Sequence, residues 1–216
     1  MKYSALIVAA GKGTRVGLGY NKMFYFMKRY GQTVLEKVTQ VFLDDPNCAQ
    51  IVIVTNRHDM HKIVLRHEHG DIIHVNGGPT RQDSVLNGLM AVSQDVVLIH
   101  DGARPWIDHD SIDRLLQSMK TEKAAILAVK TKDTIKEVKD NYIVKTVDRE
   151  YLQSAQTPQA FKTSLIIEAY VRANEQNIRV TDDAQVIELM TNIPVRIVEG
   201  SYLNNKITTK DDLKDL

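Results

Sequence analysis

Short apolar runs alternate with amphipathic stretches over the first 130 residues of the chain. The apolar runs have the length of buried strands and cover residues 5–10, 51–55, 72–75, 96–100 and 124–129. Between them, apolar residues recur at helical spacing, and Thr33 and Thr80 stand where helix N-caps are expected. A third helix is predicted to start at Asp110 or Ser111. Near-continuous apolar strands that alternate with helices predict a doubly wound α/β fold around a mostly parallel sheet.

The alternation stops near Lys130 and gives way to a hairpin pattern. Residues 134–138 and 142–147 are predicted to form two strands around a short turn, within an arm of residues 132–150. A lone two-stranded hairpin is marginally stable in water, so we expect this arm to protrude and to pack on a second subunit. Helices at 163–175 and 181–190, a strand at 195–198 and a helical turn at 211–213 complete a single predicted domain of residues 1–216.

Composition and charge narrow the classes of protein that this chain can represent. The formal net charge is +1 over 216 residues, so no overall field attracts nucleic acid or an anionic membrane. Apolar runs stay well below the roughly 18 residues of a membrane span. Cys48 is the single cysteine, which excludes an intrachain disulfide and suits a reducing compartment. These features predict a soluble cytoplasmic protein with neither a nucleic-acid nor a membrane partner.

Glycines and cations follow the first predicted strand, at the edge where open α/β sheets bind their ligands. The segment Ala-Ala-Gly-Lys-Gly-Thr-Arg-Val-Gly covers residues 9–17, and Lys22 follows it. Glycines let successive backbone N–H groups face an anion, and Arg15 and Lys22 add positive charge. The segment lacks the Walker pattern, and Gly17 comes one residue late for the dinucleotide fingerprint. We expect a phosphate-binding loop, although the glycines alone also fit a tight turn with surface lysines.

Two further polar clusters follow later predicted strands. In the first, Gly78 and the helix start offer N–H groups, while Arg81 and Ser84 offer side-chain donors to a base or a phosphate. A capped helix with an exposed Arg81 is the structural alternative. In the second, Asp101 directly follows the strand at 96–100, where a carboxylate can orient Mg²⁺ carried by a triphosphate. We expect its neighbour His100 to be a packed or capping histidine and not a catalytic base.

The motifs together resemble a known family. The order Ala-Ala-Gly-x-Gly-x-Arg, with a lysine seven residues after the arginine, resembles the signature of sugar-phosphate nucleotidyltransferases. The resemblance continues through seven later segments, which are Gly-Gly-x-x-Arg-x-Asp-Ser-Val, His-Asp-Gly-Ala-Arg-Pro, residues 130–134, Thr-Val-Asp-Arg at 146–149, Gln-Thr-Pro-Gln-Ala-Phe, Thr-Asp-Asp-Ala and Asn-Lys-Ile-Thr. In this order they resemble the 2-C-methyl-D-erythritol 4-phosphate cytidylyltransferase family over nearly the whole chain. This resemblance implies a Rossmann-like nucleotidyltransferase fold and a homodimer joined through the hairpin arm.

The resemblance also implies a role for individual residues. Those implied to bind the nucleotide are Ala10, Gly11, Gly13, Gly78, Arg81, Ser84 and Asp101, with Asp101 also near the metal. Those implied to be catalytic are Arg15, Lys22, Arg149 and Lys206. Those implied to bind the sugar phosphate are Thr134, Arg149, Thr157, Thr181 and Lys206, with Thr134 and Arg149 reaching it across the dimer interface. Met23 and Asn205 depart from the residues usual in the family and put the local geometry there in doubt.

The implied reaction transfers CMP from CTP, the co-substrate, to the sugar phosphate, with Mg²⁺ as the cofactor. A phosphate monoester is already an anionic nucleophile near neutral pH, so no general base is needed. Three other classes stay open at this stage. They are a ribitol-5-phosphate cytidylyltransferase with similar loops, a non-catalytic nucleotide-binding module, and an NAD-binding dehydrogenase, against which the late third glycine argues.

Overall fold

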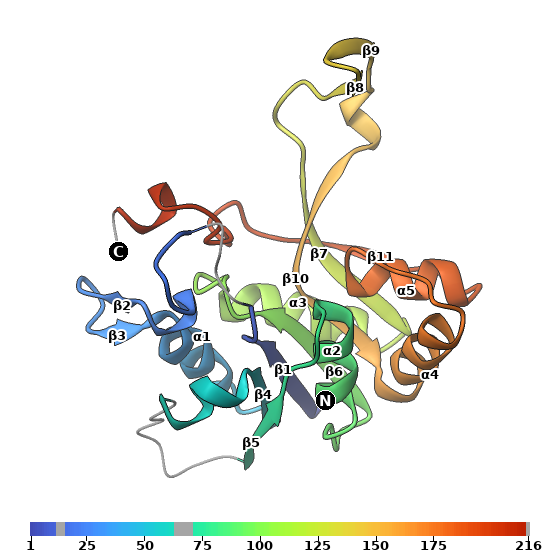
Figure 1. Cartoon of the computed structure of the whole chain (residues 1–216). Helices are drawn as coiled ribbons and strands as arrows, with labels where there is room; N and C mark the ends of the chain where they lie inside the picture. Colours follow the sequence, from blue (N-terminus) through green and yellow to red (C-terminus); the bar gives the residue numbers. More distant parts are fainter. Residues whose placement is uncertain (12–15, 63–70, 215–216) are drawn as a thin grey trace.

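A seven-stranded sheet forms the centre of the molecule. The computed structural model describes residues 1–11, 16–62 and 71–214. The strands of the sheet are β1 (Tyr3–Val8), β4 (Cys48–Thr55), β5 (Asp71–Asn76), β6 (Val96–Asp101), β7 (Ala124–Lys130), β10 (Gln153–Lys162) and β11 (Arg196–Glu199). Their order is β11-β7-β10-β6-β1-β4-β5, with parallel pairing throughout except at β10 (Figure 1). This architecture confirms the predicted α/β fold with a mostly parallel sheet.

The strand β10 is absent from the elements that the hydrophobic pattern predicts. It lies between β6 and β7 and pairs antiparallel with both. Its sequence is Gln-Ser-Ala-Gln-Thr-Pro-Gln-Ala-Phe-Lys, which has one β-branched residue and a proline. The register with β7 shifts between Ala155 and Gln159, and Pro158 lies in this irregular stretch, where a strand tolerates proline. Pairing with its two neighbours, and not its own pattern, makes this segment a strand.

Helices cover both faces of the sheet. Residues of α1 (Val34–Leu43) and α3 (His109–Ser118) belong to one buried apolar cluster. Residues of α2 (Arg81–Leu89), α4 (Thr163–Glu175) and α5 (Asp183–Met190) belong to the other. Successive residues of a strand point to opposite faces, so in β1 Ala5 and Ile7 enter the first cluster and Leu6 enters the second. The sheet therefore separates two cores, as a doubly wound fold requires.

Side-chain caps set most of the helix starts. Thr33 and Thr80 cap α1 and α2 in capping boxes, which confirms their predicted role. The expected start of α3 at Asp110 or Ser111 is wrong, because Asp108 accepts the capping hydrogen bond. The helix expected from 181 begins two residues later, after the N-cap Asp182. Runs of consecutive polar residues offer several caps, and only the backbone path selects one of them.

A hairpin projects from the body of the protein (Figure 1). Its strands β8 (Lys136–Lys139) and β9 (Tyr142–Thr146) form a sheet of their own, and every residue in them is exposed. Asp140 and Asn141 have φ values of 51° and 65°, as a tight turn of the I′ type requires at both central positions. The predicted protruding arm is therefore present, with strand bounds that lie within two residues of the expected ones.

Short elements complete the described chain. The strands β2 (Phe26–Met27) and β3 (Gln32–Thr33) form a second small hairpin. Single 3₁₀ segments occur at Lys22–Phe24, Arg57–Lys62, Arg149–Tyr151 and Asp211–Leu213. The last of these is the helical turn expected near the C-terminus. Among the residues that the structure describes, no helix has the length and apolar character needed to cross a membrane.

Candidate active site

A cavity of about 420 Å³ opens at the carboxyl ends of β1, β4 and β6. The residues that line it are Val8, Ala9, Ala10, Gly11, Asn21, Lys22, Met23, Asn56, Gly78, Pro79, Thr80, Arg81, Ser84, Asp101, Ala103 and Lys206. Eight of the residues assigned to nucleotide binding, catalysis or the sugar phosphate in the sequence are among them. They are Ala10, Gly11, Lys22, Gly78, Arg81, Ser84, Asp101 and Lys206. The cavity thus brings the three sequence clusters and the C-terminal motif to one place.

Two asparagines that the sequence reasoning missed support the start of the glycine loop. Asn21 Nδ2 donates to the carbonyl of Ala9, and Asn56 Nδ2 donates to the carbonyl of Ala10, each at 2.8 Å. The consecutive carbonyls of Ala9 and Ala10 are thereby satisfied. The other predicted loop residues, Gly13 and Arg15, lie outside the described residues. Asn21 and Asn56 lie far apart in the sequence, so no local pattern indicates that they bond to neighbouring carbonyls.

The second wall of the cavity is a glycine turn that leads into α2. The N–H of Gly78 donates to Ser84 Oγ at 3.0 Å, and Ser84 Oγ donates to the carbonyl of Thr80 at 2.8 Å. A Cβ placed on Gly78 would lie 2.3 Å from Asp83 Cβ, so any side chain there displaces the helix start. Glycine at 78 is therefore required by the close approach of the turn to the helix that follows it.

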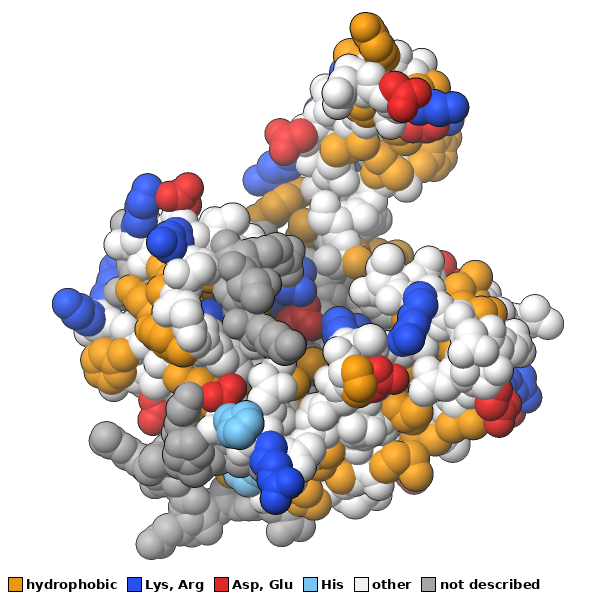
Figure 2. All heavy atoms as spheres, in the orientation of Figure 1, with side chains coloured by type: hydrophobic (Ala, Val, Ile, Leu, Met, Phe, Trp, Pro, Cys, Tyr) orange, Lys and Arg blue, Asp and Glu red, His pale blue; other side chains and the backbone are white. Residues whose placement is uncertain are grey.

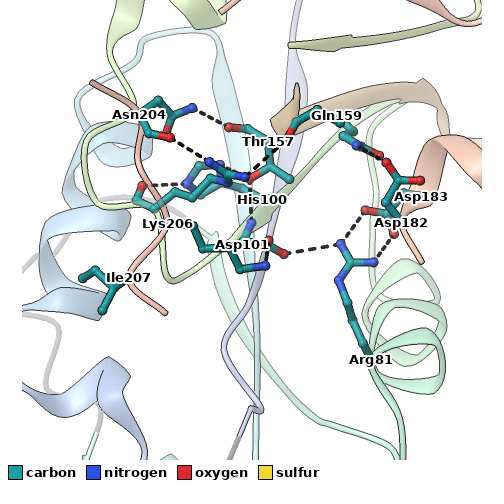
Figure 3. A network of polar contacts seen from close by, with 12 residues as sticks. Arg81, His100, Asp101, Thr157, Gln159, Asp182, Asp183, Asn204, Lys206 and Ile207 are labelled. Atoms are coloured by element: carbon teal, nitrogen blue, oxygen red, sulfur yellow. Dashed lines mark hydrogen bonds and ion pairs between the residues drawn. The ribbon is translucent and has the colours of Figure 1, made fainter. Parts of the chain in front are cut away.

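A network of four charged side chains runs from the cavity lining into the interior (Figure 3). Lys206 Nζ lies 2.5 Å from Asp101 Oδ2, and Arg81 Nη2 lies 3.4 Å from Asp101 Oδ1. Arg81 also donates to both carboxylate oxygens of Asp183, at 3.0 and 2.8 Å. Burial by itself would raise the pKa of Asp101, but Arg81 and Lys206 outweigh it and hold that pKa well below its usual range. Asp101 is therefore a carboxylate at every pH of interest.

The C-terminal segment carries Lys206 to the cavity. The N–H of Ile207 donates to the carbonyl of Ala103 at 2.8 Å, and this bond docks the segment beside β6. Lys22 Nζ donates to the carbonyl of Ile207 at 2.5 Å, so Lys22 bonds to the residue that directly follows Lys206. The two lysines are thus assembled by one segment, although 184 positions separate them in the sequence.

His100 is a packed histidine and is fully buried beneath Asp101. Its Nε2 lies 3.0 Å from the carbonyl of Arg104, which can only accept, so Nε2 carries the proton. Its Nδ1 then accepts from Thr157 Oγ1 at 3.1 Å, and Thr157 Oγ1 accepts from the N–H of Asp101 at 3.0 Å. Burial lowers the pKa of His100 to about 4. The neutral ring, with both nitrogens satisfied, positions Asp101 through Thr157, and its burial confirms the packed histidine expected from the sequence.

The remaining residues assigned to the sugar phosphate do not line this cavity. Thr157 is buried, and its hydroxyl is used between His100 and Asp101. Thr181 is exposed and bonds with Gln185 through its N–H and its hydroxyl. Thr134 and Arg149 are exposed on the arm, where Arg149 Nη1 donates to the carbonyl of Lys132 at 2.7 Å. In the single chain, the arm residues stay apart from Asp101 and Lys206.

The charged groups of the cavity suit a metal carried by a ligand better than a metal held by protein alone. In the described part of the chain, no cluster of three or more His, Cys, Asp or Glu side chains could hold an ion. Asp101 contributes a carboxylate to the cavity lining, and its two oxygens face Lys206 and Arg81. A carboxylate has about four acceptor positions, so an oxygen of Asp101 can pair with a lysine or arginine and still coordinate a metal ion. Most ligands of such an ion would come from phosphate oxygens.

Comparison with known proteins connects this cavity to a family. The family model described as 2-C-methyl-D-erythritol 4-phosphate cytidylyltransferase matches residues 3–215. The chain belongs to this family. A relative with that name from Bacillus velezensis is 41% identical over 99% of this chain and 93% of its own length.

Solved structures of the family share the fold over the same length. The 4-diphosphocytidyl-2C-methyl-D-erythritol synthase of Anaerococcus prevotii has a TM-score of 0.84 and 34% identity, and it covers 98% of this chain and 94% of its own. The 2-C-methyl-D-erythritol 4-phosphate cytidylyltransferase of Francisella tularensis has the same TM-score and identity, and it covers 99% and 97%. Membership of this cytidylyltransferase family excludes the dehydrogenase and the non-catalytic module that the glycine loop had left open.

Proposed function

We propose that this chain transfers CMP from CTP to 2-C-methyl-D-erythritol 4-phosphate and releases pyrophosphate. The observation that carries the proposal is the cavity in which Lys22, Lys206 and Asp101 meet the glycine turns of residues 9–11 and 77–78. Cations and N–H groups on one side suit a triphosphate, and the family match supplies cytidine as the base and the methylerythritol phosphate as the acceptor.

The reaction is an in-line displacement at phosphorus. A phosphate oxygen of the sugar phosphate bonds to the α-phosphorus of CTP, and the bond from that phosphorus to the bridging oxygen breaks to release pyrophosphate. An anion must approach a polyanion, so fixed cations that shield the approach are the main requirement. Lys22 and Arg15 serve the triphosphate in this proposal, and Lys206 serves the incoming phosphate. His100 takes no part in proton transfer, because it is buried and both ring nitrogens are engaged.

Mg²⁺ is the proposed cofactor, with Asp101 as its protein ligand. When bound, the ion would neutralise charge on the triphosphate. The ionised state of Asp101 and its place on the cavity lining support this assignment. Removal of divalent ions with a chelator should stop turnover. Mg²⁺ added in excess of the chelator and of CTP should restore it. Full activity in excess chelator would reject the metal.

The arm supports a proposed homodimer. Figure 2 shows hydrophobic side chains gathered along the arm. Val138, Tyr142, Ile143 and Val144 are between 55% and 79% exposed, and an isolated hairpin has no core in which to bury them. We propose that a second copy covers them, and that Thr134 and Arg149 thereby reach the sugar phosphate of the partner's site. Thr181 would complete that site from the body of the chain, whereas Thr157, whose hydroxyl is buried between His100 and Asp101, would act on it only through Asp101.

Mixing two inactive variants tests whether the arm acts across the interface. Arg149→Ala and Lys206→Met each disable one contribution to the site. If Arg149 acts on the partner's site, mixed dimers contain one intact site, and the mixture should recover up to about a quarter of wild-type activity. Two arms that act on their own chains would give no recovery. Sedimentation of an Ile143→Asp variant as a monomer would confirm that the arm makes the dimer.

Pyrophosphate release with different substrates tests the reaction itself. We expect release with CTP and 2-C-methyl-D-erythritol 4-phosphate, and far slower release with ribitol 5-phosphate or with ATP, GTP and UTP. Preference for ribitol 5-phosphate would transfer the assignment to the related wall-polymer enzymes. We also propose a cytoplasmic location, which the single free Cys48 supports because a chain without disulfides suits a reducing compartment.

A further inference from the structure

A buried carboxylate stands directly behind the cavity wall. Asp183 is the first residue of α5 and has no exposed surface. It does not line the cavity, yet both of its oxygens accept from the guanidinium of Arg81, which does. Burying a carboxylate is costly unless it is paired and hydrogen-bonded. The buried carboxylate of Asp183 is therefore retained for its interaction with the guanidinium of Arg81.

A second buried group fixes the orientation of Asp183. Tyr170, from α4, is fully buried and donates its hydroxyl to Asp183 Oδ1. Burial and the nearby Asp183 charge raise the pKa of Tyr170 well above its usual value, so the hydroxyl remains a donor. The carboxylate is thus anchored by α4 on one side and holds Arg81 on the other. These contacts restrict the positions that the guanidinium of Arg81 can adopt.

The distances show what this anchoring does for Asp101. Arg81 approaches Asp183 at 2.8 and 3.0 Å but approaches Asp101 only at 3.4 Å, near the limit of a hydrogen bond. An arginine beside a single carboxylate favours a close bidentate pair with it. Asp183 takes that pairing and leaves Asp101 with one close cation, Lys206. The oxygen Oδ1 of Asp101 therefore keeps acceptor positions that a ligand can use.

We propose that Asp183 is a positioning residue, which holds the guanidinium of Arg81 at the cavity wall and prevents it from closing onto Asp101. The proposal rests on the proposed function in one respect, namely that CTP binds in this cavity. Without the charge of Asp183, Arg81 turns to Asp101, and the carboxylate that faces the nucleotide becomes blocked. CTP binding then weakens even though no residue that touches CTP has changed.

The matched variants are Asp183→Asn and Asp182→Asn. Asp182 is the adjacent residue and caps α5 by accepting from the N–H of Gln185. Its carboxylate also accepts from Gln159 and does not contact Arg81 (Figure 3). Titration calorimetry with CTP and Mg²⁺ should show a dissociation constant raised roughly ten-fold to a hundred-fold in Asp183→Asn, the scale of losing a hydrogen bond to a charged group. Asp182→Asn should lose thermal stability and keep its affinity for CTP. Equal affinities in the two variants would overturn the proposal.

A double variant separates positioning from general damage. If Asp183 acts only through Arg81, adding Asp183→Asn to Arg81→Ala should not weaken CTP binding further. Independent, additive losses would contradict the mechanism. Should Asp183→Asn fail to fold, Tyr170→Phe removes one anchor of the carboxylate, and a raised dissociation constant for CTP is expected there too; an unchanged constant counts against the proposal. CTP binding is measured without the second substrate, so a wrong sugar phosphate would leave this test intact.

Discussion

The ion pair between Lys206 and Asp101 gives the most specific prediction for the site. Its atoms lie 2.5 Å apart, and the Asp101 side chain is 12% exposed while that of Lys206 is 34% exposed. Lys206→Met keeps an unbranched apolar side chain and removes the terminal ammonium, with its charge and its N–H donors. Asp101 is then left with Arg81, whose nearest nitrogen is 3.4 Å away. The substitution therefore tests the charge of Lys206 separately from its packing.

Two effects of different size are expected. A hydrogen bond between charged groups contributes about 1.5–3 kcal/mol, and the partial exposure of Lys206 places its loss near 1–2 kcal/mol. For a chain of this length, that free energy lowers the melting temperature by roughly 2–8 °C. Turnover should fall by about 10²–10³, because a fixed cation at the reacting phosphate is lost. Activity thus falls far more than stability.

Steady-state release of pyrophosphate, with each substrate varied in turn, is the assay. The loss should appear as a raised KM and a lowered kcat/KM for methylerythritol phosphate, with a smaller change in KM for CTP. Lys214→Met is the control, since Lys214 lies in the same C-terminal segment, is 72% exposed and pairs with Asp211 at the surface. Kinetic constants in Lys206→Met that match those of Lys214→Met would refute the assignment of Lys206.

The pH dependence of stability gives a second readout of the same variant. The pKa of Asp101 is depressed in the folded protein, so its stabilisation is complete above the unfolded value near 4 and is lost as the pH falls below it. Removing Lys206 takes away one of the two cations that depress this pKa. The acid-induced loss contributed by Asp101 should therefore be smaller in Lys206→Met than in the wild type, because the folded pKa then lies closer to the unfolded one. Superimposable acid-unfolding curves would contradict the electrostatic account of Asp101.

Three further predictions follow from the site. Lys22→Ala should lower turnover by about 10²–10³ while the protein stays folded, and near-normal turnover would show that its ammonium does not stabilise the triphosphate. Burial lowers the pKa of His100 from its usual 6.5 to about 4, so this residue stabilises the fold fully above pH 6.5 and progressively less as the pH falls towards 4. This pH-dependent loss of unfolding free energy is about 3 kcal/mol at most, and it should be absent in His100→Gln. Gly78→Ala should weaken CTP binding because a Cβ there would meet Asp83 at 2.3 Å, whereas Gly88→Ala, which meets the core at Val54 and Leu6, should lower only the melting temperature. Equal effects of the two glycine substitutions on CTP binding would contradict the role of the turn at 78.

Local patterns in the sequence were enough for most of the framework. Apolar runs of strand length and helical spacing predict the parallel strands and the helices, because burial of one stripe or both faces leaves a periodic signature. Thr33 and Thr80 are recognisable as caps because a cap bonds a backbone N–H three residues away. The order of the motifs also indicates the family, which the match over residues 3–215 confirms.

The interactions that assemble the site depend on the tertiary structure. β10 becomes a strand because β6 and β7 supply hydrogen-bond partners on both sides, although its own sequence has a weak strand pattern. Lys206 meets Asp101 across 105 positions of sequence, and Arg81 meets Asp183 across 102. No periodicity encodes contacts of that range. The sequence by itself determined most of the strands and helices and the residues that can bind a ligand, since periodicity and capping act within a few residues. Only the tertiary structure decided which of these residues meet, because contacts between distant segments form where packed strands and helices bring them together.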